Sequence, residues 1–266
     1  MIYKGLCKLE ATYTTQLQAG LGLVEETKEL LSLYEGEMNA SELYERAMSS
    51  GAFPTITARR LRNIVSECFS PRYLKSDAAG GLKLLSPNLP SLSLRQLFLI
   101  HTALANHILL DFIAEVYWAK YAAGQDELTA DDARRFVENA VNEGKTQTHW
   151  SESTIKRVSS YVLGCCADYD LLAAGRSTKR RIQPQRITPS TSLYLAYWLH
   201  FSGLGDNAVI NHKIWRLFGL ETNEVRAEFK SLAKHGWLIV QAAADITRVT
   251  WKLGSMQEVI DVIVES

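Results

Sequence analysis

The chain has 266 residues, of which 47% are hydrophobic and 22% are charged. This composition excludes a disordered tail and supplies enough apolar surface for a substantial core, in one large domain or two ordinary ones. The 29 basic residues balance the 29 acidic ones, so net charge gives no information about partners. Four cysteines without zinc-site spacing, and a start without a signal-peptide pattern, predict a cytoplasmic protein.

A helix is predicted over residues 23–34, and two more lie in residues 41–70 on either side of a turn. Ser41 is the expected cap of the first of these two helices, and Thr55 or Thr57 of the second. Arginines fill the first turns of the second helix, where the helix dipole disfavours cations, so they do not stabilise the helix. A recognition helix presents side chains to the DNA major groove from this position. A helix pair without a ligand fits the pattern equally well. The candidate DNA contacts here are Arg59, Arg60 and Arg62.

Two segments concentrate basic residues. Residues 55–75 hold five basic side chains and one acidic one, and residues 176–186 hold five basic side chains and no acidic one. In a neutral protein such patches suit phosphate binding, and solvated surface segments are the alternative of equal weight. The first patch comprises Arg59, Arg60, Arg62, Arg72 and Lys75. The second comprises Arg176, Lys179, Arg180, Arg181 and Arg186, all of them candidate DNA contacts.

The longest apolar stretch covers residues 92–121 and follows an irregular connection predicted for residues 71–93. Without Pro or Gly, the stretch is expected to form one helix of about 30 residues, roughly 45 Å long at 1.5 Å per residue. Polar residues such as His107 and Asp111 lie within it and make a membrane span costly. We therefore expect a buried core helix and no membrane association.

A helix capped by Thr129 is predicted over residues 130–143, and a helix capped by Ser151 follows after a polar turn. This is a second helix–turn–helix pattern, in which Lys156 and Arg157 are candidate DNA contacts. Cys165 and Cys166, in the same helix, are expected to be buried as small apolar groups.

The basic segment 175–190 contains two prolines and is predicted to be an extended, exposed linker. It divides the chain into a helical N-terminal lobe, residues 1–174, and a C-terminal lobe, residues 191–266. The C-terminal lobe reads as helices, followed by two short strands in residues 237–253 and a closing amphipathic helix in residues 256–263.

Asp206 and Thr222 are the expected caps of the last two helices before the strands. Helix, turn, helix and two strands is the order of a winged helix, whose second helix enters the major groove. A small α+β cap without a ligand is the alternative. The candidate contacts of the second helix are Arg226 and Lys230, with Asn223 and Lys234 beside them and Arg248 near the wing.

No nucleotide-binding loop or nucleophile elbow occurs in the sequence. His107 and Asp111 lie four residues apart on one helix, but such a pair is more often a satisfied polar pair in the core. We therefore predict no catalytic residues, no metal site and no cofactor.

Four segments, in this order within residues 15–240, resemble the BrxA family. They read GLGLVEETKELLSLYE, ITARRLRNIV, IHTALANHILLDFIAEVYW, and HWSESTIKRVSSYVL with DYDLL behind it. BrxA is the small A component of the bacteriophage exclusion (BREX) defence system. The resemblance implies a non-enzymatic, mainly α-helical, cytoplasmic protein that binds double-stranded DNA. It also implies work beside a methyltransferase, an ATPase, a phosphatase-like protein and a Lon-like protease, and it assigns no contact residues.

The sequence thus predicts a mainly α protein with helix–turn–helix elements around a long central helix and with a small C-terminal β-wing. The expected function is that of a monomeric double-stranded DNA-binding component of phage defence, which binds mainly through phosphate contacts. The alternative is a protein–protein adaptor that assembles other defence components and uses its helix–turn–helix units as scaffolding.

Overall fold

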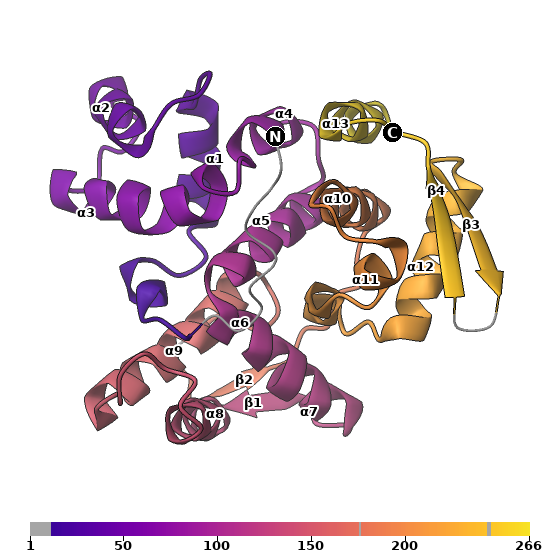
Figure 1. Cartoon of the computed structure of the whole chain (residues 1–266). Coiled ribbons are helices and arrows are strands. Elements are labelled where there is room, and N and C mark those ends of the chain that lie inside the picture. Colours follow the sequence, from indigo (N-terminus) through magenta and orange to yellow (C-terminus); the bar gives the residue numbers. More distant parts are fainter. Residues whose placement is uncertain (1–11, 176, 244–245) are drawn as a thin grey trace. The chain divides into compact units, whose positions relative to one another are not determined.

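The computed structural model describes residues 12–175, 177–243 and 246–266 (Figure 1). The fold is mainly α-helical, as predicted, and the strands of the described residues form two antiparallel pairs. The chain forms two compact units. We call residues 12–83 and 98–185 the helical unit, and residues 84–97 and 186–266 the hairpin unit. The division into lobes at residues 175–190 stays a prediction.

The first half of the helical unit consists of short helices. They are a 3₁₀ helix Gln16–Ala19, α1 Val24–Leu33, α2 Ala40–Ser50, α3 Ala58–Asn63, a π-helix Ile64–Leu74 and α4 Ala79–Leu85, whose last two residues belong to the hairpin unit. The prediction of an irregular connection over residues 71–93 is therefore wrong, because helix continues through Pro71 and resumes in α4.

The remaining elements of the helical unit follow the central stretch. They are α6 His107–Phe112, a π-helix Ile113–Tyr117, α7 Trp118–Ala122, β1 Glu127–Thr129, α8 Ala130–Asn142, α9 Glu152–Asp168 and β2 Lys179–Arg181. Strand β2 pairs with β1, with Arg181 opposite Glu127 and Lys179 opposite Thr129. The predicted linker is thus extended, but part of it is built into a sheet.

The central stretch is not the single helix predicted. Helix α5, Ser91–Ala105, and the segment His107–Ala122 meet at an angle of 115°. Asn106 lies at the bend with non-helical backbone angles, and its side-chain amide donates to the Thr102 carbonyl oxygen at 2.9 Å. Asparagine offers the backbone this local alternative to helical hydrogen bonding. Among the described residues, no single helix is long and apolar enough to span a membrane. Helix α5 and the segment His107–Ala122 taken together have the length and apolarity of a span, but they are bent relative to one another.

Helix starts in the helical unit follow side-chain caps. The Thr57 hydroxyl accepts from the Arg60 N–H at 3.3 Å, and Thr129 and Ser151 cap α8 and α9 as predicted. The prediction of Ser41 as a cap is wrong, because Asn39 accepts from the N–H groups of both Ser41 and Glu42. Helix α2 therefore starts one residue earlier than the serine.

A buried arginine holds the first turns of the helical unit together. Arg72 is 2% exposed, and its guanidinium donates to the carbonyl oxygens of Gly20 at 3.0 Å, Leu21 at 2.9 Å and Gly22 at 3.3 Å. The Tyr169 hydroxyl also donates to the Gly22 carbonyl, at 3.1 Å. Arg72 thus belongs to the core, and its assignment to a basic surface patch is wrong.

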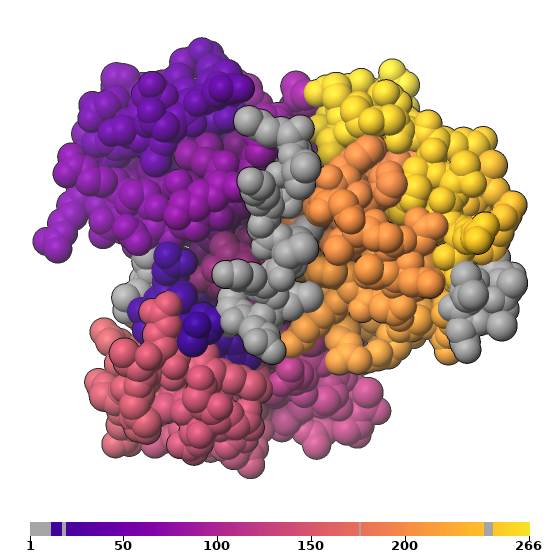
Figure 2. Space-filling model, viewed as in Figure 1, coloured from indigo at the N-terminus to yellow at the C-terminus, as the bar shows by residue number. Residues whose placement is uncertain are grey.

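The hairpin unit contains the start of α5 and the C-terminal elements. They are α10 Pro189–Phe201, α11 Asp206–Ile210, a 3₁₀ helix Lys213–Phe218, α12 Thr222–Lys234, β3 Leu238–Ala243, β4 Ile246–Trp251 and α13 Met256–Glu265. The two predicted strands and the closing helix are confirmed. In the space-filling view, α10 to β4 (orange to yellow) form one closely packed body (Figure 2).

Two predicted caps of this unit are wrong. Glu221, one residue before Thr222, is the N-cap of α12, because its carboxylate and that of Glu224 bond reciprocally to the backbone of this first turn. Asp206 is the first residue of α11, after the cap Gly205, and its carboxylate is used elsewhere. It accepts from the Val249 N–H at 2.8 Å and the Trp251 indole N–H at 3.0 Å.

The β3–β4 hairpin is fixed to the helices at both ends. The Tyr197 hydroxyl of α10 donates to the Trp237 carbonyl oxygen at 2.6 Å and accepts from the Lys252 N–H at 3.0 Å. The Trp251 ring stacks on His200 with a centroid distance of 4.2 Å. Together with the Asp206 bonds, these contacts orient the hairpin relative to α10 and α11.

Candidate nucleic-acid interface

Helix α12 has one buried face and, opposite it, a basic stripe in which Arg226 is half-buried and the other side chains are exposed. Val225, Phe229 and Leu232 are buried in the core of the hairpin unit. The opposite side carries side chains spaced three or four residues apart, which lie on one helix face. They are Asn223, Arg226, Lys230 and Lys234. The Arg226 guanidinium donates to the Asn223 side-chain oxygen at 3.3 Å, so these two polar groups lie side by side.

No carboxylate of α12 forms an ion pair with Lys230 or Lys234 within the described residues. Glu221 pairs with Arg216 at 3.1 Å, and Glu224 accepts from the Glu221 N–H at 2.8 Å. Glu228 accepts from the Ser192 hydroxyl at 3.0 Å. The acids are thus used for capping and packing, and Lys230 and Lys234 remain exposed.

The hairpin beside α12 adds one exposed cation. Arg248 lies in β4 opposite Gln241 of β3, and both side chains are exposed. The neighbouring residues Thr247 and Val249 are buried, as strand alternation requires. Arg248 therefore projects from the outer face of the hairpin.

The arginines of α3 are all exposed, as the sequence predicts. The Arg62 guanidinium lies 4.9 Å from the centre of the Tyr44 ring of α2, a cation–π contact. Arg59 has no ion pair or side-chain hydrogen bond within the described residues. Helices α2 and α3 therefore present these cations from a packed helix pair.

In the first turns of α9, Lys156 and Arg157 are also exposed. The Arg157 guanidinium reaches the Thr154 hydroxyl at 3.5 Å, the limit of a hydrogen bond. Neither side chain forms an ion pair within the described residues.

The three cations of strand β2 lie on two faces, because successive side chains of a strand point in opposite directions. Lys179 and Arg181 are exposed on one face, about 6.6 Å apart along the strand at 3.3 Å per residue. Arg180 points the other way, is half-buried and donates to the Leu163 carbonyl oxygen of α9 at 3.3 Å. The predicted run of three exposed cations is therefore reduced to two.

The last two predicted contacts flank this strand in sequence. Arg186 is exposed and belongs to the hairpin unit, where its carbonyl oxygen accepts from the Gln96 side-chain amide at 2.8 Å. Arg176 lies outside the described residues. The predicted contacts thus fall in both units.

Ion pairing separates the candidates from many other cations. Lysines and arginines elsewhere bind carboxylates, for example Lys120 with Asp132 at 2.8 Å and Arg46 with Glu35. Within the described residues, several candidates have no such partner. They are Arg59, Lys156, Lys179, Arg181, Arg186 and Lys230. An unpaired exposed cation keeps its full charge for an anionic ligand.

The described residues contain no group of three or more His, Cys, Asp or Glu side chains placed to hold a metal ion. Asp111, one half of the predicted polar pair, accepts from the Tyr13 hydroxyl at 2.6 Å. Burial lowers the pKa of His101 to about 3 and raises the pKa of Cys165 to about 12, so both groups are uncharged near neutral pH. Cys165 and Cys166 are buried, as predicted.

Comparisons with known proteins give one family match. The family model BrxA matches residues 11–197 of this chain. A search of curated proteins returns no match. Among solved structures, the crystal structure of an uncharacterized protein from Magnetospirillum magneticum is similar at 13% identity and a TM-score of 0.49, over 78% of this chain and 98% of that one.

Proposed function

We propose that the chain, which belongs to the BrxA family and is thus a component of a BREX phage-defence system, is a non-enzymatic protein that binds double-stranded DNA. Binding would depend mainly on contacts with phosphates. The observation that carries the proposal is the basic stripe of α12, on which Lys230 and Lys234 are exposed and form no ion pair within the described residues.

In this proposal the hairpin unit acts as a winged helix. Helices α10 and α11 would support α12 in the major groove, and the β3–β4 hairpin would lie along the backbone as the wing. Arg226 and Asn223, near the start of α12, have the side chains that bind guanine and adenine edges in pairs of hydrogen bonds. Lys230, Lys234 and Arg248 would bind phosphates and fix the register.

The cations of the helical unit would add phosphate contacts. Each predicted set, on α3, α9 and β2, is small, and phosphate contacts add affinity without sequence information. We therefore expect sequence preference to be weak and to reside in α12.

Fluorescence anisotropy with a labelled duplex, over about 50–200 mM salt, tests the proposal. Changing Lys230 and Lys234 together to Glu should weaken binding at least tenfold. It should also lower the salt slope by about 1.8, since each phosphate that a lysine no longer neutralises lowers the slope by about 0.9. The charge-matched control changes Lys28 and Lys145 to Glu, because both lysines already pair with acids. Equal affinities of the two variants would rule out α12 as the interface.

The helical unit is tested in the same assay by two further variants. One changes Arg59, Arg60 and Arg62 to Glu. The other changes Lys179 and Arg181 to Glu and leaves Arg180, because Arg180 bonds to the Leu163 carbonyl and its loss would disturb packing. A set whose variant binds like the wild type is not part of the DNA surface.

An adaptor function is the second candidate, and the edge of β3 favours it. Val249 directs its N–H to Asp206, so its opposite residue Val240 directs its backbone groups away from β4. The edge has no backbone partner among the described residues, and Ile239 on it is 45% exposed. Such an edge can accept a strand from another protein.

The two functions make opposite predictions for the purified protein. A DNA-binding component should bind duplex at 50 mM salt and elute as a monomer in size-exclusion chromatography. An adaptor should not bind duplex DNA and should bind another BREX protein. We propose that these partners are a methyltransferase, an ATPase, a phosphatase-like protein and a Lon-like protease. We also propose a cytoplasmic location, which fractionation of cells tests.

A further inference from the structure

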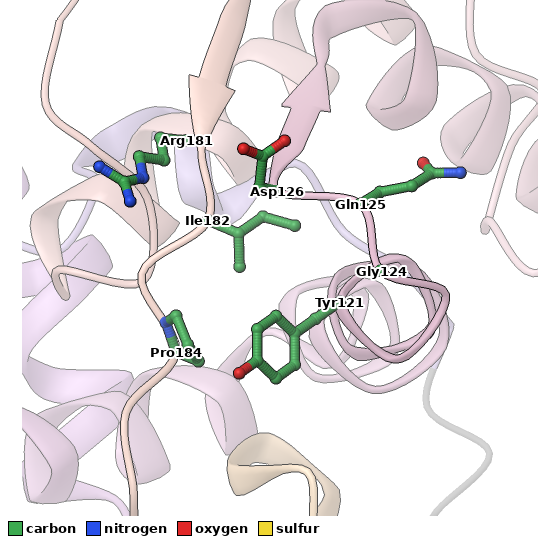
Figure 3. A pocket seen from close by; sticks show the side chains of 7 residues that line it. All are labelled: Tyr121, Gly124, Gln125, Asp126, Arg181, Ile182 and Pro184. Atoms are coloured by element: carbon green, nitrogen blue, oxygen red, sulfur yellow. The ribbon is translucent and has the colours of Figure 1, made fainter.

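A pocket of about 310 Å³ opens on the helical unit between the end of α7 and the segment after β2 (Figure 3). Tyr121 and Pro184 lie on one side of it, and Ile182 extends toward the Tyr121 ring from the other. Asp126 and Arg181 stand at the rim. The volume lies at the lower end of the range of small-ligand sites, about 300–1,000 Å³.

The walls of the pocket suit a flat apolar group. Tyr121 is 47% exposed, which is unusual for a large hydrophobic side chain in this protein. Its ring is steadied by an edge contact with Trp118 at a centroid distance of 5.8 Å. The opposite wall is fixed because the Ile182 N–H donates to the Asp126 carbonyl oxygen at 2.7 Å. An exposed, fixed aromatic face is the usual platform for a stacked ring.

The charges around the pocket place an anion outside it and not within it. Asp126 is at the rim, so a phosphate inside would meet its carboxylate. Lys179 and Arg181 are exposed on the same face of β2, and no carboxylate pairs with either of them within the described residues. Glu127 lies opposite Arg181 in the sheet without forming an ion pair with it. A ligand with a flat ring and an attached phosphate matches this distribution.

We propose that the pocket binds an unpaired nucleobase of DNA. The base stacks on Tyr121 beside Pro184, and the adjoining phosphates contact Lys179 and Arg181. Asp126 favours guanine, because guanine presents two neighbouring N–H donors, N1–H and N2–H, to one carboxylate. This inference rests on the proposed DNA-binding function and extends it from duplex to single-stranded or locally opened DNA.

Anisotropy with the full chain tests this site, with a single-stranded thymine-rich oligonucleotide that carries one guanine and with a duplex in parallel. Tyr121→Ala should weaken single-strand binding at least about fivefold, the lower end of the loss for one stacked base. Duplex binding should change less than twofold. Tyr121→Phe should keep single-strand affinity, because it keeps the ring. Tyr161→Ala, at a half-buried tyrosine on α9, is the matched control.

Base choice provides a second readout. The wild type should prefer the oligonucleotide with guanine over one with adenine at the same place, and Asp126→Asn should remove this preference. The site is wrong if Tyr121→Ala leaves single-strand affinity unchanged or weakens duplex binding equally. It is also wrong if the pocket instead binds a peptide that competes with no oligonucleotide. Failure of the wild type to bind any DNA would instead refute the proposed function.

Discussion

The carboxylate of Asp206 is expected to hold the hairpin in place, and its removal should loosen β4. It accepts from the Val249 N–H at 2.8 Å and the Trp251 indole N–H at 3.0 Å. A hydrogen bond to a charged group contributes about 1.5–3 kcal/mol, and a half-buried site lies at the lower end. Asp206→Ala should therefore destabilise the hairpin unit by about 3 kcal/mol, from two such bonds. Asp206→Asn keeps one acceptor oxygen and should cost about 1.5 kcal/mol.

Amide hydrogen exchange at Val249 measures this loss locally. At a factor of ten per 1.4 kcal/mol, Asp206→Ala should accelerate exchange on the order of 100-fold if β4 opens by itself. The Trp251 indole N–H signal in an NMR spectrum should also shift in Asp206→Ala. Because the chain has six tryptophans, the variant Trp251→Phe is needed to assign this signal. Asp261→Ala on α13 is the control, because Asp261 is exposed and bonds only locally, to Gln257. If Asp206→Ala exchanges no faster than this control, Asp206 does not anchor the hairpin.

Three further predictions concern the helical unit. Arg72→Met should lower the free energy of unfolding by about 3–5 kcal/mol in urea titrations, because the carbonyl oxygens of Gly20 and Leu21 lose their donor and that of Gly22 keeps only the Tyr169 hydroxyl. A loss below 1 kcal/mol would contradict the role of Arg72 in the core. Burial alone would raise the pKa of Asp132, but hydrogen bonds from Lys120, Thr129 and Arg135 outweigh it and hold this pKa well below its usual value. The resulting stability is present above the unfolded pKa, near 4, and is lost as pH falls below it, so acid titration of Asp132→Asn should show a shallower decline than the wild type. Burial raises the pKa of Cys68, Cys165 and Cys166, so with Cys7 changed to Ser the native protein should not react with a thiol reagent at pH 8, and rapid labelling would disprove this.

Helix starts were predictable wherever the signal is local. Thr129 and Ser151 are single acceptors placed before a first turn, and each caps the helix that follows it. Of the two candidates before α3, Thr55 and Thr57, the structure selects Thr57. Two of the three errors arose where a preceding polar side chain caps the helix instead, and the third, Asp206, lies inside α11 after the cap Gly205. Asn39 precedes Ser41 and bonds to its N–H, and Glu221 precedes Thr222 and exchanges bonds with the first turn of α12. Sequence gives the candidates but not the backbone angles that choose between them.

The bend at Asn106 shows what apolar periodicity cannot reveal. The whole stretch from Ser91 to Ala122 has strong helix formers and no Pro or Gly, so propensity favours one helix. The turn of 115° depends on where the neighbouring segments offer buried surface, and packing of that kind outweighs the propensity of a single residue. Asn106, with its own bond to Thr102, was the one local signal.

Charge runs predicted where cations cluster in sequence but not where they point. Arg72 is buried because carbonyl groups about fifty residues earlier surround it, and Arg180 turns inward because β2 pairs with β1. Neither contact is visible from composition. A basic run therefore predicts an interface only after two groups of cations are left out. The first group binds backbone carbonyls inside the fold, and the second is paired with acidic side chains.

When both groups are left out, each unit still has unpaired exposed cations. A duplex could therefore contact one unit or both. If one duplex contacts both units, their sites are linked and the second contact forms at a high effective concentration. Removal of either set would then weaken binding far more on a long duplex than on one too short to reach both. If each unit binds separately, the effects of changing Lys230 and Lys234 and of changing Lys179 and Arg181 should simply add on any length. Comparing the combined variant on duplexes of two lengths decides between these arrangements, and it does so without knowledge of the DNA sequence preferred.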